Sequence, residues 1–192
     1  MCTLRPLAGL EELPLPEQMD DTPQWFVMRD LKRSNAKLPA YRMLEEMHIQ
    51  CFTPMVTKIL LRNGKRERRL VPYLPDLLFV YDTRQVLDPL VDRMPTFQYR
   101  YLKGRVPMTV RPSDMERFIR VVSAAAFPRY YRPDEVTPDM HRRPVRIIGG
   151  QLDGMEGHLL SVRGSRVRRL LVELPSVLAA SVEVEPDYIE LL

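Results

Sequence analysis

The 192-residue chain has only two cysteines, three histidines and one tryptophan. Two cysteines cannot build a disulfide framework, and neither Cys2 nor Cys51 lies at a spacing typical of a metal site. No run approaches the roughly 18 apolar residues of a membrane span, and no apolar signal core follows the first residue. We therefore expect a cytoplasmic protein with no membrane contact.

Catalytic motifs are also missing. His48, His141 and His158 are scattered, with no Cys or carboxylate at ligand spacing. The chain has no Gly-x-Ser-x-Gly elbow, and the glycines around Gly149 lack the Gly-Lys-Ser/Thr ending of a phosphate-binding loop. We therefore expect a protein without catalytic residues, metal or cofactor, and hence not an enzyme.

Positive charge is present and clustered, although 29 Lys and Arg against 25 Asp and Glu give a net charge of only +4. One cluster surrounds Asn63-Gly64, a dipeptide typical of a hairpin tip. Its members are Arg62, Lys65, Arg66, Arg68 and Arg69. A second cluster comprises Arg163, Arg166, Arg168 and Arg169. Each cluster suits a polyanion, although a solvated turn is the usual explanation for a run of charge.

Proline positions divide the chain. Residues 1–23 form a Pro-containing acidic segment that we expect to be a disordered arm. Residues 24–126 mix strand and helix signals and predict an α+β domain with an antiparallel sheet flanked by helices. Residues 127–143, interrupted by prolines, predict a semi-rigid linker that permits either docked or independent domains. Residues 144–192 alternate in polarity and predict a small all-β barrel.

Local signals fill in the first domain. Aromatic and branched residues at 25–29 predict a strand, and the nearly continuous apolar run at 77–81 predicts a strand buried on both faces. A helix is expected from about Leu38, with an apolar stripe that ends at Met47. Ser113 and Glu116 form a capping box that predicts the start of another helix.

The barrel begins with the stretch Val145 to Gly157, where an alternating strand runs into four glycines within nine positions. Glycines at this density indicate backbone with positive φ or close approach of two chains.

Taken together, these features resemble the NusG family of transcription elongation factors. The stretch Val145 to Gly157 is similar to the motif that opens the family's KOW domain, which is an SH3-like barrel. Trp25-Phe26-Val27 and Tyr73 to Val80, with Pro75 followed by Asp76, resemble two signatures of the family's N-terminal (NGN) domain. Asp76 replaces the family Gly, which favours a diverged paralogue. The segment Ile49 to Pro54 is similar to UpxY-type antiterminators.

The resemblance implies function. In the family an apolar socket on the N-terminal domain grips the clamp helices of the largest subunit of RNA polymerase, which suppresses pausing or termination. The matching positions are Trp25, Phe26, Leu74 and Leu77, of which we expect Leu74 and Leu77 to be exposed. The basic cluster Arg62, Lys65, Arg66, Arg68 and Arg69 would contact nucleic acid near the transcription bubble.

For the KOW domain the resemblance implies a ribosomal protein or Rho as partner, reached through one loop. The corresponding loop residues are Gly150, Leu152, Gly154, Met155 and Gly157. A monomer is expected. The alternative interpretation is an RNA- or ribosome-binding KOW protein that acts in translation, in which the N-terminal domain only supports the barrel.

Overall fold

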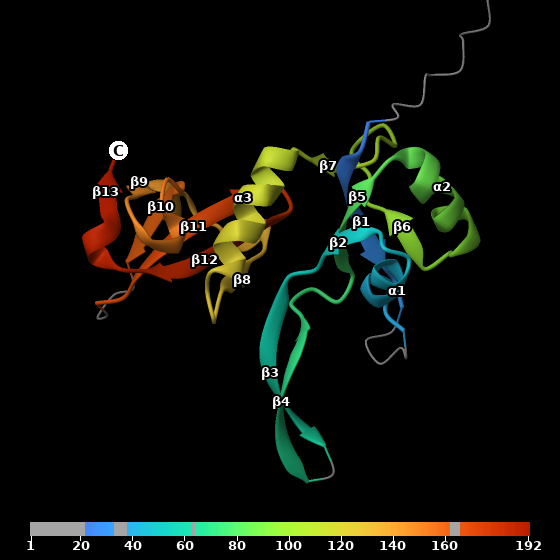
Figure 1. The fold of residues 1–192 in the computed structure, drawn as a ribbon, viewed down its shortest axis with the longest axis horizontal. Coiled ribbons are helices and arrows are strands. Elements are labelled where there is room, and N and C mark those ends of the chain that lie inside the picture. The colour runs from blue at the N-terminus through green and yellow to red at the C-terminus, as the bar shows by residue number, and fades with distance from the viewer. Residues whose placement is uncertain (1–21, 33–37, 63, 162–165) are drawn as a thin grey trace, which may run out of the picture.

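The computed structural model describes residues 22–32, 38–62, 64–161 and 166–192. The predicted arm, residues 1–23, therefore lies almost entirely outside the described residues. The rest forms an α+β N-terminal module, a long two-stranded hairpin and an all-β C-terminal module (Figure 1). This is the predicted fold class. Among the described residues, no helix has the length and apolar character needed to cross a membrane.

The N-terminal sheet is antiparallel and has the order β2-β5-β1-β6, with β7 also paired to β1. Its strands are β1 (Gln24–Asp30), β2 (Gln50–Phe52), β5 (Leu77–Asp82), β6 (Phe97–Tyr99) and β7 (Thr109–Val110). The hairpin consists of β3 (Met55–Arg62) and β4 (Lys65–Pro72). β2 pairs with β5 in the sheet, whereas β3 pairs with β4 in the hairpin.

Both faces of the central strands β1 and β5 are buried, as the apolar run at 77–81 predicted for β5. Side chains alternate across a strand, so Trp25 and Val27 of β1 join one core cluster while Phe26 and Met28 join another. The second cluster is covered by α1 (Ala40–Glu46) and α2 (Arg84–Arg93), and the first lies beneath α3 (Pro112–Ser123).

Two helix predictions need correction. Met47, placed on the apolar stripe, lies after the end of α1 and is exposed. The N-cap is not Ser113, as the predicted capping box requires, because α3 begins two residues earlier, with Arg111 at the N-cap and Pro112 in the first turn. Proline already has the φ of a helix and lacks one of the N–H groups that a cap would satisfy.

The C-terminal module is one antiparallel sheet of order β13-β9-β10-β11-β12-β8. Five of its strands come from the predicted barrel: β9 (Pro144–Ile147), β10 (Glu156–Ser161), β11 (Arg168–Leu174), β12 (Leu178–Val184) and β13 (Ile189–Leu191). The predicted glycine conformations are also found. Gly149 has φ 106°, and a Cβ on Gly157 would overlap the carbonyl oxygen of Leu171.

The sixth strand, β8 (Arg129–Tyr131), comes from the segment predicted to be a linker. It pairs with β12, and residues 133–135 and 138–141 form short 3-10 helices. The prolines of this segment prevent a long helix, but they leave room for a three-residue strand at the edge of the sheet. The segment 127–143 is therefore part of the C-terminal module.

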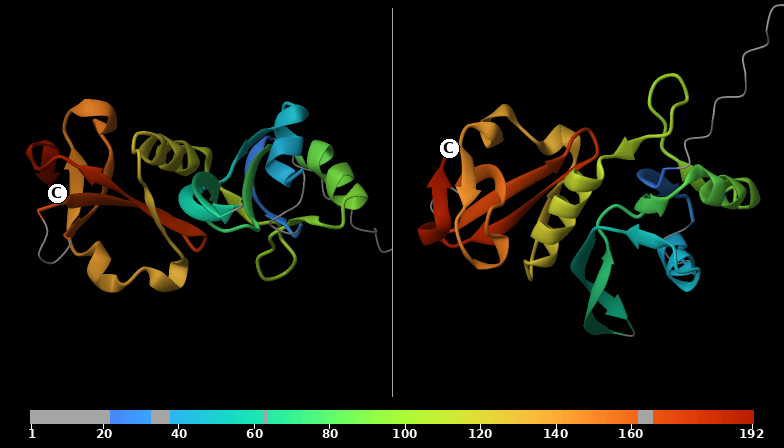
Figure 2. Two further views of the ribbon diagram at one scale, coloured as in Figure 1. Left: turned by 90° about the horizontal axis from the view of Figure 1, so that it is seen from below. Right: turned by 45° about the horizontal axis from the view of Figure 1, so that its top comes forward.

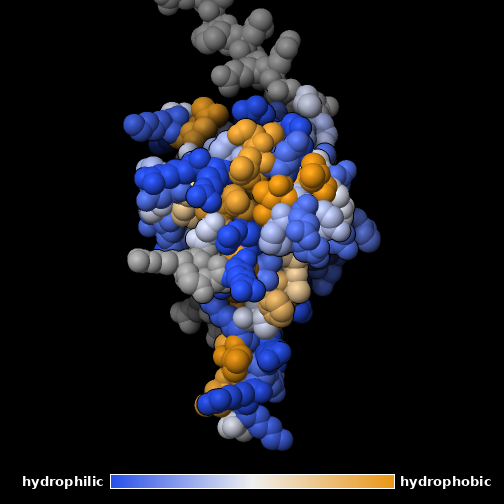
Figure 3. Space-filling model, turned by 90° about the vertical axis from the view of Figure 1, so that its left-hand side faces the viewer, coloured by the Kyte–Doolittle hydropathy of each residue, from blue (hydrophilic) through white to orange (hydrophobic). Residues whose placement is uncertain are grey.

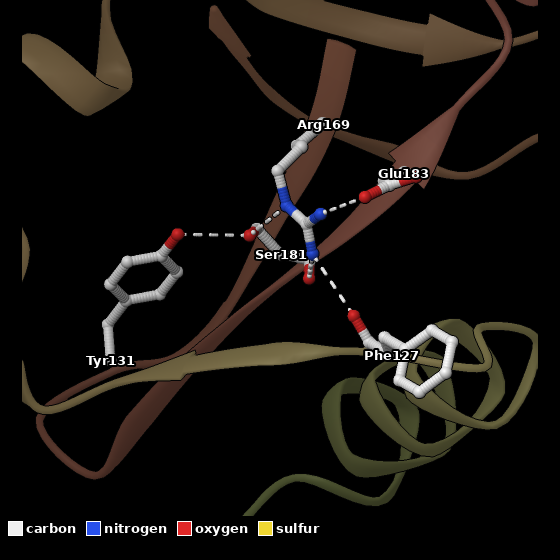
Figure 4. A network of polar contacts seen from close by, with 5 residues as sticks. All are labelled: Phe127, Tyr131, Arg169, Ser181 and Glu183. Atoms are coloured by element: carbon white, nitrogen blue, oxygen red, sulfur yellow. Dashed lines mark hydrogen bonds and ion pairs between the residues drawn. The ribbon is translucent and has the colours of Figure 1, made fainter. Parts of the chain in front are cut away.

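A buried arginine holds this segment in place (Figure 4). Arg169 is only 2% exposed and donates from Nε to Ser181 Oγ (2.9 Å) and from Nη1 to Glu183 Oε1 (2.8 Å). Its Nη2 donates to the carbonyl oxygens of Ser181 (2.7 Å) and Phe127 (3.3 Å). Arg169 was predicted to belong to a surface cluster, but this side chain is structural.

The two modules share one apolar core. In Figures 1 and 2, α3 lies between the N-terminal sheet and the C-terminal sheet. Phe118 of α3 meets Phe52 of β2 edge-on, with ring centroids 6.3 Å apart. On its other side α3 packs against β11 and β12. Of the two arrangements that the sequence permitted, the structure has the docked one.

Candidate functional site

The most distinctive surface is the hairpin β3–β4, which projects from the body of the molecule (Figures 1 and 3). The two strands pair along eight residues each and with no other strand in the described part of the chain. Gly64 has φ 74°, as the predicted turn requires, whereas Asn63 and the side chain of Arg62 lie outside the described residues.

The basic residues of the hairpin are divided between its two faces. Pairing of Ile59 with Arg68 and of Leu61 with Arg66 places these four residues on one face, where all are exposed. Lys65 and Arg69 belong to the opposite face together with Glu67. Arg69 Nε lies 3.4 Å from Glu67 Oε2 in an exposed ion pair. Four of the five predicted nucleic-acid contacts are thus exposed.

A two-stranded ribbon with exposed apolar side chains is marginally stable in water by itself. Ile59 and Leu61 are 65% and 74% exposed, and orange patches interrupt the blue surface of the hairpin in Figure 3. Contiguous exposed apolar side chains rimmed by charge are typical of a surface that meets a partner.

A pocket of about 610 Å³ lies between the base of the hairpin and the body. Its apolar lining comes from Leu60, Leu70, Val71, Pro72, Pro75, Leu77 and Leu78. Its basic lining comes from Lys32, Arg42, Lys58 and Arg69. Asp30 also lines the pocket, where its carboxylate accepts hydrogen bonds from the backbone N–H groups of Lys32 and Ala40. Basic side chains still outnumber this one carboxylate, so the pocket suits the end of a helical hairpin that carries negative charge.

The predicted socket residues do not lie together. Leu77 lines this pocket but is only 4% exposed, so the expectation that it is exposed is wrong. Leu74 is half-buried and accepts a backbone hydrogen bond from Leu77 (3.1 Å). Trp25 is buried and lines a separate pocket with Tyr81 and Ile119, and Phe26 points to the opposite face of the sheet. A one-residue offset in a strand reverses the face, so Phe26 cannot share a socket with Trp25.

The predicted KOW partner loop faces α3. Arg120 of α3 donates to the carbonyl oxygens of Gln151 (3.3 Å) and Asp153 (3.2 Å). Leu152 is buried and Met155 packs against the shared core, whereas Gly150 and Gly154 are exposed. Gly157 is half-buried within β10. The expected apolar loop surface is therefore covered by the N-terminal module.

A second contact joins the modules beside the hairpin. Tyr73 and Tyr130 pack with ring centroids 5.4 Å apart, and the Tyr73 hydroxyl donates to Glu135 Oε2 (3.2 Å). Burial raises the pKa of Tyr130 to about 12, so its ring is neutral at physiological pH. The sequence carried no signal for this contact, because Tyr73 lies in the predicted N-terminal domain whereas Tyr130 and Glu135 lie in the predicted linker.

Comparison with known families identifies the class of protein that this fold belongs to. The family model described as transcription termination factor NusG matches residues 23–119, just over half of the chain. The match runs from the start of β1 into α3 and includes the projecting hairpin and the pocket at its base. A search of curated proteins found no match.

The chain therefore belongs to the NusG family, as the sequence resemblance predicted. At the level of the family it is a transcription elongation or antitermination factor, and the family binds RNA polymerase.

Proposed function

We propose that this protein binds the clamp helices of RNA polymerase through the pocket at the base of the hairpin and acts without catalysis. The observation that carries the proposal is the position of this pocket within the NusG-family match. Leu77 and Leu78 line the wall beside Pro75, and Leu60 and Leu70 offer apolar contact at the hairpin. Lys58 and Arg69 add positive charge at the same place.

In this proposal the hairpin extends from the clamp toward nucleic acid near the transcription bubble. Arg66 and Arg68 are the favoured phosphate contacts, because Arg69 is paired with Glu67 and lines the pocket. Bound in this way, the protein would bridge the polymerase cleft and suppress pausing or termination. Phosphate contacts made by arginine are independent of sequence and weaken as salt rises.

The first test is a pull-down with purified core RNA polymerase. We expect the wild type to bind and Leu70→Asp to lose binding, because an aspartate at this pocket wall is desolvated on docking. Leu70 is 66% exposed, so the substitution tests binding rather than folding. Leu102→Asp is the matched control, since Leu102 is 51% exposed and lies outside the pocket lining.

Failure of the wild type to bind polymerase would refute the proposal and favour the RNA- or ribosome-binding alternative. Equal binding by the wild type and Leu70→Asp would keep the polymerase partner but move the contact away from the pocket.

The second test measures nucleic-acid affinity against salt concentration. The double variant Arg66→Ala/Arg68→Ala should lower the slope of log K against log salt by about 2, because each phosphate contact contributes roughly 0.9. Lys65→Ala/Arg69→Ala removes the same charge from the opposite face and serves as control. A larger effect of the control pair would assign the contact to the other face.

A further inference from the structure

Three potential metal ligands meet on the C-terminal module, although the sequence separates them widely. His141 ends the 3-10 helix Pro138–His141, His158 lies in β10 and Glu173 lies in β11. One ligand atom from each residue lies within 4.8 Å of the other two. His141 and His158 have no Cys or carboxylate at ligand spacing in the sequence, but the fold brings both of them to Glu173.

The sheet fixes two of these ligands relative to each other. His158 pairs with Leu171, and Glu173 follows two positions further along β11 on the same face. Such diagonal neighbours are within reach of long side chains. Both residues are half-buried, so their side chains have limited freedom.

The segment that crosses this face supplies the third ligand. His141 Nε2 contacts Glu173 Oε1, and its ring meets the His158 ring edge-on with centroids 4.9 Å apart. The backbone beside it is anchored, because Leu159 N donates to the carbonyl oxygen of Arg143 (2.8 Å). All three side chains thus converge from three separate segments.

We propose that His141, His158 and Glu173 form a binding site for a divalent first-row transition metal, with Zn²⁺ as the expected ion. Two imidazoles and one carboxylate are a ligand set that Zn²⁺ accepts, with the fourth position open to water. A pocket of about 370 Å³ lined by His158, Glu173 and Gly157 adjoins the site and gives an ion a path to it. Nothing in the NusG-family assignment calls for this site.

The protonation of the site agrees with this assignment. Burial and the neighbouring His141 lower the pKa of His158 below its ordinary value. A neutral imidazole is the form that coordinates metal. A simple ion pair of His141 with Glu173 is the competing explanation, and in it His158 has no role.

The consequence of binding is mechanical. The metal would tie the segment that leads into β9 to β10 and β11, and so would fasten the 3-10 helix Pro138–His141 to the sheet of its own module. A metal ion that binds the folded state but not the unfolded state raises the unfolding temperature.

The test uses full-length protein stripped with EDTA and then titrated with Zn²⁺. At Zn²⁺ 100-fold above Kd, we expect the unfolding temperature to rise by roughly 5–10 °C, with reversal by EDTA. His158→Asn and Glu173→Gln should each weaken binding by at least about tenfold, since even supporting residues of metal sites contribute this much. Co²⁺ bound in place of Zn²⁺ should show the visible absorption that is typical of a four-coordinate site.

His48→Asn is the matched control, because His48 is exposed with φ 58°, a conformation that asparagine tolerates. It should bind Zn²⁺ like the wild type. If His158→Asn fails to fold, His141→Asn, at an exposed position, takes its place. Absence of Zn²⁺ binding by the wild type, or binding unchanged in these variants, would overturn the proposal.

Discussion

Arg169 offers the sharpest test of what holds the 127–131 segment on the C-terminal sheet. Arg169→Met keeps much of the length and apolar stem of the side chain but removes all four hydrogen bonds of the guanidinium. Not all four losses cost the same. Ser181 Oγ keeps its hydrogen bond with Tyr131 (3.1 Å), and the Glu183 side chain is 65% exposed and regains water.

The main cost comes from the carbonyl oxygen of Ser181, a residue with no exposed surface. A buried acceptor that loses its partner costs about 1–3 kcal/mol, and each partly exposed bond adds about 0.5–1.5 kcal/mol. Part of this is offset, because burial lowers the pKa of Arg169 and so disfavours its charged form. We expect a net loss of about 2–3 kcal/mol, which corresponds to about 4–12 °C in a chain of this size.

Thermal unfolding followed by circular dichroism measures this loss, and hydrogen exchange at Tyr130 and Tyr131 shows whether β8 is released. Arg169→Lys should also destabilise, because a lysine lacks the planar fork that reaches several acceptors together. Arg166→Met, at an exposed position, is the control. An Arg169→Met protein with wild-type stability and unchanged exchange would refute this explanation of the 127–131 segment.

Two further predictions concern single residues. Burial, and secondarily Glu45, raises the pKa of Cys51 to about 11, so at pH 8 its thiolate population is about a hundredfold smaller than that of an unperturbed cysteine. Iodoacetamide should therefore alkylate Cys51 slowly in a Cys2→Ser variant, and a rate equal to that of free cysteine would contradict the prediction. Gly157→Ala should destabilise by about 1–3 kcal/mol in a denaturant melt, because its Cβ would overlap the backbone of Leu171. A Gly157→Ala midpoint equal to that of the wild type would show that β11 moves aside freely.

Much of the fold was predictable from local patterns. The continuous apolar run at 77–81 predicted a strand buried on both faces, and β5 has buried residues in both core clusters. Glycine conformations near Gly149 followed from composition, because few other residues tolerate positive φ. These signals act over a few residues, so one sequence is enough to reveal them.

The other features of the fold and of the candidate site depend on contacts between residues far apart in the chain, and such contacts leave no local pattern in a single sequence. His141 and Glu173 are 32 residues apart and meet only because residues 132–143 cross the face of β10 and β11. The burial of Leu77 likewise depends on α3 and the shared core. Arg169 looked like part of a solvated charge cluster because its buried partner, Ser181, lies on the neighbouring strand.

Docking of the modules also limits how the C-terminal loop can be used. Leu152 lies in the core shared with α3, and Arg120 holds the backbone on both sides of it. Both bonds from Arg120 go to carbonyl oxygens at an exposed site, and each is weak enough to exchange with water. The apolar contact is the larger barrier, because separation would expose the flank of α3 that packs on β11 and β12. A partner that contacts Leu152 must therefore replace the apolar contact that this side chain makes in the shared core. A partner that contacts only the exposed Gly150 and Gly154 can bind while the two modules stay docked.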